Sequence, residues 1–259
     1  MNIDVSLSQL NIEYFLLVLV RITSFVYIAP FFGQKNVPQR IKLGLSVFIS
    51  LIVFNLSPGK VPEYNTVFDY GAQVISESIA GLLIGFSAFI CNTIILFAGR
   101  MIDTDIGFSM STVFDPTTNT QMSLTGTFYQ YMLMLMMIAS NMHLFLLNAI
   151  VDSFSLFPVG GFSPKATMYN TVIGFLRDYF IIGFRIVLPV FVSILLLSCA
   201  MGIMTKVASQ INMFSVGIQI KMLGGLFILF FTISLLPTIA NFIFEEMQEK
   251  VINIMKTMY

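Results

Sequence analysis

Residues 72–98 read AQVISESIAGLLIGFSAFICNTIILFA and carry a single charged side chain, Glu77. A helix of this length is about 40 Å long, which exceeds the roughly 30 Å hydrocarbon layer of a bilayer. Because such a run offers no polar face to water, it is typical of a membrane-spanning helix. We therefore expect an all-α membrane protein.

The composition of the whole chain agrees with this expectation. Of the 259 residues, 57% are hydrophobic and 10% are charged, whereas an ordinary soluble domain has roughly 25% charged residues. Thirteen basic residues balance thirteen acidic ones, so no basic field exists that would attract nucleic acid. So few charged residues cannot cover the surface of a water-soluble protein, and we therefore predict that the chain contacts lipid or other subunits.

About six apolar segments follow one another along the chain, and no long polar segment separates them. We therefore expect one membrane domain over residues 1–259. Because the second segment is short and the last two are long, kinked helical hairpins are expected rather than straight rods. Pro189 and Pro237 should each kink or break a helix, since proline removes a helical hydrogen bond. The predicted segments are 12–32, 41–56, 72–98, 128–151, 172–203 and 216–244.

Ionisable side chains inside these segments are the first functional candidates. Each costs roughly 2.5 to 3.5 kcal/mol at a lipid-facing helix centre, so they should face protein or water. They could pair with one another between helices, or they could line a proton or ion route. The intramembrane polar candidates are Arg21, Glu77, His143, Arg177, Asp178 and Arg185.

Patterns for catalysis or metal binding are weak. His143 is the only histidine, and neither HExxH nor CxxC spacing is present. Asp103 and Asp105 are separated by one residue in a predicted loop, whereas a catalytic carboxylate pair needs two chain segments. Cys91 and Cys199 lie in apolar runs, where a thiol behaves as a small hydrophobe. We expect no enzyme, and no catalytic, cofactor or metal site.

A cluster of methionines marks the fourth segment, where residues 131–142 read YMLMLMMIASNM. Methionine is unbranched and deformable, so a wall of such side chains could form an apolar seal around a changing object. A helix packed in an ordinary apolar core is the alternative. The candidate seal residues are Met132, Met134, Met136 and Met137.

Residues 99–127 form a predicted long loop of mixed character. It contains Phe108, Met110, Val113 and Phe114, which would be unfavourable in water. The loop should therefore fold back onto a cavity or another surface. An ordered structural connector is the alternative.

Several motifs resemble the FliR family, the export-gate membrane proteins of the bacterial flagellar type III secretion apparatus, and their SctT/SpaR-like injectisome counterparts. The first part of the chain has Arg21, then APFF at 29–32 and VP at 37–38. Its middle has DP at 115–116, SF at 153–154 and PVG at 158–160. The last part has MTK at 204–206 and QINMFSVG at 210–217. The resemblance covers nearly the whole chain.

This resemblance implies one copy of the chain in a helical hetero-oligomeric assembly with several copies each of FliP and FliQ, and with FlhB and FlhA as further partners. The assembly would be the channel for unfolded export substrates across the bacterial inner membrane, in the flagellar basal body. The resemblance also implies that a plug-like loop at about 106–122 closes the pore. The implied plug residues are Ile106, Gly107, Phe108, Met110, Val113, Phe114, Asp115 and Pro116.

Two other functions stay open at the level of the sequence. One is an injectisome export-gate subunit of the same family. The other is a secondary transporter or ion-channel subunit, whose path Arg21, Glu77, Asp178 and Arg185 would line. A transporter predicts inverted internal repeats, and none is evident in the sequence.

Overall fold

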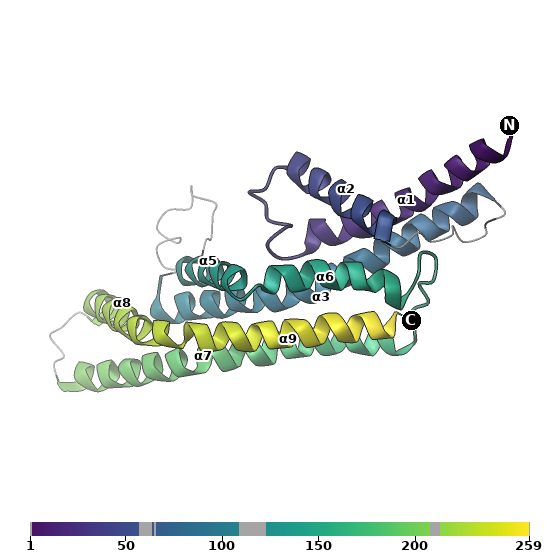
Figure 1. Ribbon diagram of the computed structural model, residues 1–259. Coiled ribbons are helices and arrows are strands. Elements are labelled where there is room, and N and C mark those ends of the chain that lie inside the picture. The colour runs from purple at the N-terminus through teal and green to yellow at the C-terminus, as the bar shows by residue number, and fades with distance from the viewer. Residues whose placement is uncertain (1, 57–63, 65, 109–122, 208–212, 259) are drawn as a thin grey trace. The chain divides into compact units, whose positions relative to one another are not determined.

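The structure is a computed structural model that describes residues 2–56, 64, 66–108, 123–207 and 213–258. Within these ranges every regular element is a helix (Figure 1), which confirms the predicted all-α membrane fold. The elements are α1 (Asn2–Ile28), α2 (Gln39–Leu56), α3 (Val67–Ile106), α5 (Leu124–Ala139), α6 (Met142–Leu156), α7 (Thr167–Val207), α8 (Met213–Thr232), the 3-10 turn η1 (Ile233–Leu235) and α9 (Leu236–Thr257).

Four helical stretches among the described residues are long and apolar enough to cross a membrane. The bent pair of α5 and α6 passes the same test as a unit, which makes up to five spans. The first predicted segment forms α1, which carries Glu13 and Arg21 and is not among these spans. The four stretches are Gln39–Leu56, Val67–Ile106, Thr167–Val207 and Val216–Thr257.

Two of the predicted segments are divided in the structure. Segment 128–151 was expected to be one run, but the chain breaks between α5 and α6, where Asn141 has a φ of 57°. Asparagine tolerates this left-handed conformation better than most residues. Segment 216–244 is interrupted by η1, which ends two residues before Pro237, as the proline predicts. Pro189, in contrast, lies inside the uninterrupted helix α7.

The loop predicted over 99–127 was too long. Helix α3 continues to Ile106 and α5 begins at Leu124, so Asp103 and Asp105 are helical residues. The apolar residues Ile102 and Ile106 are both buried and lie one helical turn apart, which extends the core-facing stripe of α3. Gly107 ends the helix with a φ of 98°, a conformation that glycine adopts without strain.

The described helices divide into two compact units. The first unit consists of Met1–Cys91, Ser140–Leu176 and Glu245–Tyr259, and the second of Asn92–Ala139 and Arg177–Phe244. The chain passes from one unit to the other four times, within α3, α7 and α9 and between α5 and α6. The prediction that residues 1–259 act as one membrane domain stays a prediction.

In the first unit, α2 folds back against α1 (Figure 1). The buried side of α2 carries Ser46 and Ser50, whose hydroxyl groups donate to carbonyl groups one turn earlier in the same helix, at 2.8 and 2.6 Å. Hydroxyls satisfied in this way can lie in an apolar contact without loss. The opposite side of α2 exposes large apolar side chains, among them Phe48 and Leu56, as expected of a surface that meets lipid or protein.

Hydrogen bonds connect distant segments of the first unit at two places. The Tyr64 hydroxyl donates to the Glu13 carboxylate at 2.6 Å. This hydrogen bond raises the pKa of the Tyr64 phenol above its ordinary value, and the negative charge of Glu13 acts in the same direction. At the other end, the backbone amides of Ser163 and Lys165 donate to carbonyls of Met258 and Thr257. The last turn of the chain is therefore fixed to the segment that leads into α7.

In the second unit, glycines let helices approach closely. Phe97 on α3 lies where a Cβ of Gly183 on α7 would be, and its ring makes edge contacts with Phe180 and Phe184 at centroid distances of 5.6 and 5.9 Å. Small residues at helix contacts are typical of membrane proteins, in which close packing replaces the hydrophobic effect between helices. The buried face of α7 repeats every four residues, at Ile182, Ile186, Val190 and Ile194.

Candidate functional sites: a buried ion pair and the α3–α5 junction

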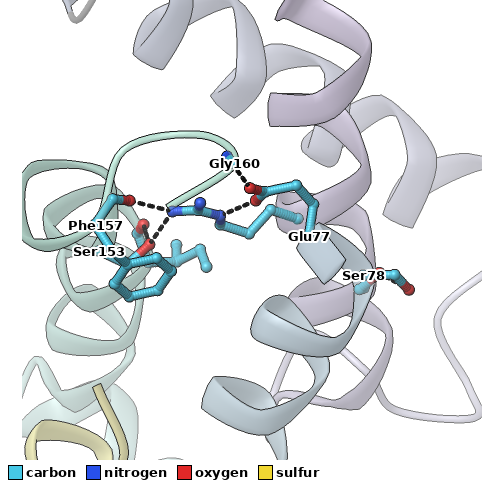
Figure 2. Close-up of polar contacts among 8 residues, drawn as sticks. Glu77, Ser78, Ser153, Phe157 and Gly160 are labelled. Carbon is cyan, nitrogen blue, oxygen red and sulfur yellow. Dashed lines mark hydrogen bonds and ion pairs between the residues drawn. The ribbon is translucent and has the colours of Figure 1, made fainter. Parts of the chain in front are cut away.

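The first site is an ion pair in the core of the first unit. Arg21 on α1 and Glu77 on α3 are both fully buried, and Arg21 Nε donates to Glu77 Oε2 at 2.5 Å. Arg21 Nη1 donates to the carbonyl of Phe157 at 3.1 Å and lies 3.4 Å from Ser153 Oγ. Figure 2 shows Glu77 on one side of this network and Ser153 and Phe157 on the other.

The second oxygen of Glu77 binds the loop that follows α6. Glu77 Oε1 accepts the backbone N–H of Gly160 at 2.7 Å (Figure 2), and Gly160 has a φ of 78°. Both carboxylate oxygens are thus engaged, one by a charged donor and one by a backbone amide. Because charge-assisted hydrogen bonds are the strong ones, a single carboxylate joins α1, α3 and the loop between α6 and α7.

Aromatic rings and a glycine complete the surroundings of Arg21. The guanidinium lies 4.2 Å from the centroid of Phe154 and 4.4 Å from that of Phe157, distances at which cation–π attraction is favourable. A Cβ at Gly81 of α3 would collide with the backbone carbonyl of Arg21, so glycine is needed for α1 and α3 to meet here. The burial of both charges favours structural pairing over an ion route.

The remaining polar candidates lie on α6 and α7. Arg177 and Asp178 are neighbours on α7 and form an ion pair of 3.3 Å, with the Arg177 side chain 73% exposed. Arg185 is exposed on α7 and has no hydrogen bond or ion pair within the described ranges. His143 on α6 is half-buried, with its ring 5.8 Å from that of Phe31.

The second site is the junction between α3 and α5, where Asp103 caps a helix. Its buried carboxylate accepts the hydroxyl of Ser123 at 2.6 Å and the backbone N–H of Thr125 at 3.2 Å. Ser123 in turn accepts the backbone N–H of Gly126 at 2.9 Å. Two amides that the first turn of α5 leaves without helical partners are thereby satisfied. The negative charge of Asp103 also lies at the positive end of the α5 dipole.

The same face of α3 touches the backbone of α5. Gly99 lies one turn before Asp103, and a Cβ at Gly99 would collide with the backbone of Gly126. A Cβ at Gly126 would meet Ser123 Oγ at 2.5 Å and the carbonyl of Leu96 at 3.0 Å. Both glycines are therefore needed for this helix crossing, and the crossing brings Asp103 within reach of the α5 terminus.

The structure describes only the first three predicted plug residues. Ile106 is fully buried, and Gly107 and Phe108 are half-buried. The backbone amides of Gly107 and Phe108 both donate to the carbonyl of Asp103, at 3.1 and 2.9 Å, which ends α3 tightly. The other predicted plug residues, Met110, Val113, Phe114, Asp115 and Pro116, lie outside the described residues.

The predicted seal residues lie along α5 in two environments. Met137 is fully buried, whereas Met132, Met134 and Met136 are half-buried. Met132 and Met136 line an apolar crevice too narrow for a water molecule, together with Tyr129, Leu236 and Ile239. The two side chains therefore pack against α9 in the second unit.

Sequence reasoning missed most partners in both sites. Ser153 and Gly160 belong to motifs that carry the family resemblance, but they bind through a hydroxyl and a backbone amide, which do not predict a partner. Ser123 could have been found, because it precedes an apolar helix in the pattern typical of an N-cap. Among the described residues, no group of three or more His, Cys, Asp or Glu side chains could hold a metal ion.

The long apolar helices and the charges buried between them define a multi-pass helical membrane protein. The chain matches the family described as bacterial export proteins, family 1, over residues 12–247, and it belongs to that family. It is 31% identical to the flagellar biosynthetic protein FliR of Bacillus subtilis (strain 168), over 93% of this chain and 94% of that protein.

Other relatives are flagellar as well. Identity is 27% to FliR of Escherichia coli (strain K12), over 96% of this chain and 93% of the relative. Identity to FliR of Aquifex aeolicus (strain VF5) is also 27%, over 91% of this chain and 93% of the relative. The resemblance predicted from the sequence is confirmed: the chain is a membrane protein of the flagellar export apparatus, in a family that is not enzymatic.

Proposed function

We propose that this chain is a core subunit of the flagellar export gate. With several copies each of FliP and FliQ it forms the channel through which unfolded flagellar proteins cross the inner membrane, and FlhB and FlhA are its further partners. The observation that carries this proposal is family membership across nearly the whole chain, residues 12–247. A subunit of this kind supplies a path and a barrier, and the energy for export comes from other components.

The surface of the second unit is compatible with such an assembly. The outer sides of α7 and α8 carry large apolar side chains that nothing in the described part of this chain covers, which marks them as contact surfaces for lipid or neighbouring subunits. The most exposed of them are Leu196, Ile203, Val207, Leu223, Phe227, Phe230 and Phe231.

Subunit composition tests the proposal directly. The chain is co-expressed with its genomic neighbours, extracted in detergent and weighed by native mass spectrometry. We expect one large complex with one copy of this chain and several copies of each of two smaller membrane proteins. A homodimer or a lone monomer as the main species would contradict the export-gate assignment and favour a transporter.

We further propose that residues 106–122 include the plug of the closed gate, and that Met132, Met134, Met136 and Met137 belong to its apolar seal. The support is the family resemblance and the apolar character of the segment. Deletion of residues 109–122 should leave the complex assembled but make the cell membrane leaky to small solutes. Unchanged permeability in complexes of normal composition would exclude the plug assignment.

A further inference from the structure

Ile106, the last residue of α3, fits a notch on α8. It is fully buried. A Cβ added to Gly225 of α8 would lie 2.7 Å from both Cγ atoms of Ile106 and 3.0 Å from its Cδ1. Those distances are too short for any carbon contact, so the space that Ile106 fills exists only because residue 225 is glycine. The end of α3 is therefore fixed to α8 by shape.

The start of α5 is fixed to α3 by hydrogen bonds. Asp103, one turn before Ile106, accepts the Ser123 hydroxyl and the Thr125 amide, and Gly99 touches the backbone of Gly126. The backbone carbonyl of Asp103 accepts the amides of Gly107 and Phe108. Residues on both sides of 109–122 are thus attached to one turn of α3, and that turn is attached to α8.

We propose that Ile106 and Asp103 are positioning residues of the export gate, with Gly225 as the receptor for Ile106. They join the end of α3 to α8 and α5 and hold the two stems from which residues 109–122 depart. This inference rests on the proposed export-gate function. It divides the predicted plug residues, because it assigns Ile106 to the anchor.

A size exchange between residues 106 and 225 tests the anchor. Gly225→Ala inserts a methyl group into the space of Ile106, and Ile106→Ala removes the side chain that fills it. Each single variant should assemble normally but increase the rate of small-solute entry roughly 5- to 30-fold, the factor that one or two kcal/mol gives in a two-state equilibrium. The double variant should return most of the way to the wild-type rate, since the new methyl group occupies part of the vacated space.

Two glycine variants are matched controls. A Cβ at Gly202 of α7 would meet nothing within 4 Å. One at Gly224 of α8 would lie 2.6 Å from the terminal Cδ2 of Leu197, the end of a flexible side chain that can move aside. Gly202→Ala and Gly224→Ala should therefore keep the wild-type permeability. A Gly224→Ala defect as large as that of Gly225→Ala would overturn the assignment of Gly225.

Two measurements separate this inference from the proposed function. Solute entry is measured in cells, and the melting temperature is measured on the purified complex. Defects that add in the double variant for both quantities would overturn the anchor. Rescue of the melting temperature without rescue of permeability would show a structural contact only, and would overturn the positioning role. Failure of the 109–122 deletion to cause a leak would instead contradict the plug, whatever the exchange variants do.

Discussion

Arg21 in the first unit and Arg185 in the second are both arginines within apolar helices, but their surroundings are opposite. Arg21 is fully buried, pairs with Glu77, donates to the carbonyl of Phe157 and lies within 4.4 Å of two aromatic ring centroids. Arg185 is exposed on α7 and makes no ion pair in the described part of the chain. A charge in an apolar medium must be compensated, so Arg21 is compensated within its own unit, whereas Arg185 depends on its surroundings.

The largest expected effect comes from breaking the buried pair. Glu77→Ala leaves the Arg21 guanidinium buried without its counter-charge and should destabilise the chain by about 3 to 5 kcal/mol. The measurement is the amount of folded chain in membranes, together with its melting temperature in detergent. Arg177→Ala is the control, because its side chain is 73% exposed and should contribute at most about 1 kcal/mol. Equal behaviour of the two variants would remove the contrast between the units.

Replacing both members of the pair sharpens the same comparison. The double variant Arg21→Met, Glu77→Leu leaves no uncompensated charge, and buried ion pairs can often be exchanged for apolar side chains at little cost. We therefore expect the double variant to be more stable than Glu77→Ala. If it were less stable, the hydrogen bonds to Phe157 and Gly160 would be the dominant contribution.

The next largest effect is expected at the close contact between Gly81 of α3 and the backbone of Arg21. Gly81→Ala would push α3 away from the carbonyl of Arg21 and should cost about 1 to 3 kcal/mol, as overpacking usually does. Gly71→Ala, in the same helix with nothing near its Cβ, should be neutral or slightly stabilising. Chemical unfolding of the two variants in parallel measures the difference. A neutral Gly81→Ala would show that α1 and α3 can separate freely at this point.

The sequence was sufficient for the helical membrane fold and for the break near Pro237, but not for the break at Asn141 or for the end of α3. Long apolar runs admit little besides helices in a bilayer, so segments such as 72–98 are unambiguous. The turn at Asn141 depends on one residue adopting a left-handed conformation, which asparagine permits but does not require. The extension of α3 through Asp103 depends on the partners that Ser123 and Thr125 supply to its carboxylate, and these lie some twenty residues away in the chain.

In the buried ion-pair site, only the charged residues could be predicted from the sequence. Arg21 and Glu77 stand out because charges are rare in apolar runs, but their pairing joins residues 56 positions apart, and no local pattern encodes such a distance. Gly81, Gly99 and Gly225 act through the side chain they lack. A single sequence does not distinguish these glycines from Gly71 or Gly202, whose surroundings are open.

A smaller effect is expected where the second unit does contain a buried charge. Asp103→Ala removes the acceptor of the Ser123 hydroxyl and the Thr125 amide and should cost about 1 to 2 kcal/mol, the usual loss for a helix cap. Hydrogen exchange should accelerate in the first turn of α5 and nowhere else in that helix. Thr104→Ala is the matched control, since the Thr104 hydroxyl is exposed and binds only its own helix. Uniform acceleration along α5 would contradict a local capping role.

The smallest effect on the chain itself is expected for Arg185. Because its side chain has no hydrogen bond or ion pair to lose within the described ranges, Arg185→Leu should change the stability of the isolated chain by no more than about 0.5 kcal/mol. The test is to measure melting temperatures of the isolated chain and of the assembled complex for the same variant. A loss confined to the complex would place the compensating group for Arg185 on another subunit. A large loss in the isolated chain would mean that the second unit, like the first, satisfies its own charges, and the contrast between the two arginines would not hold.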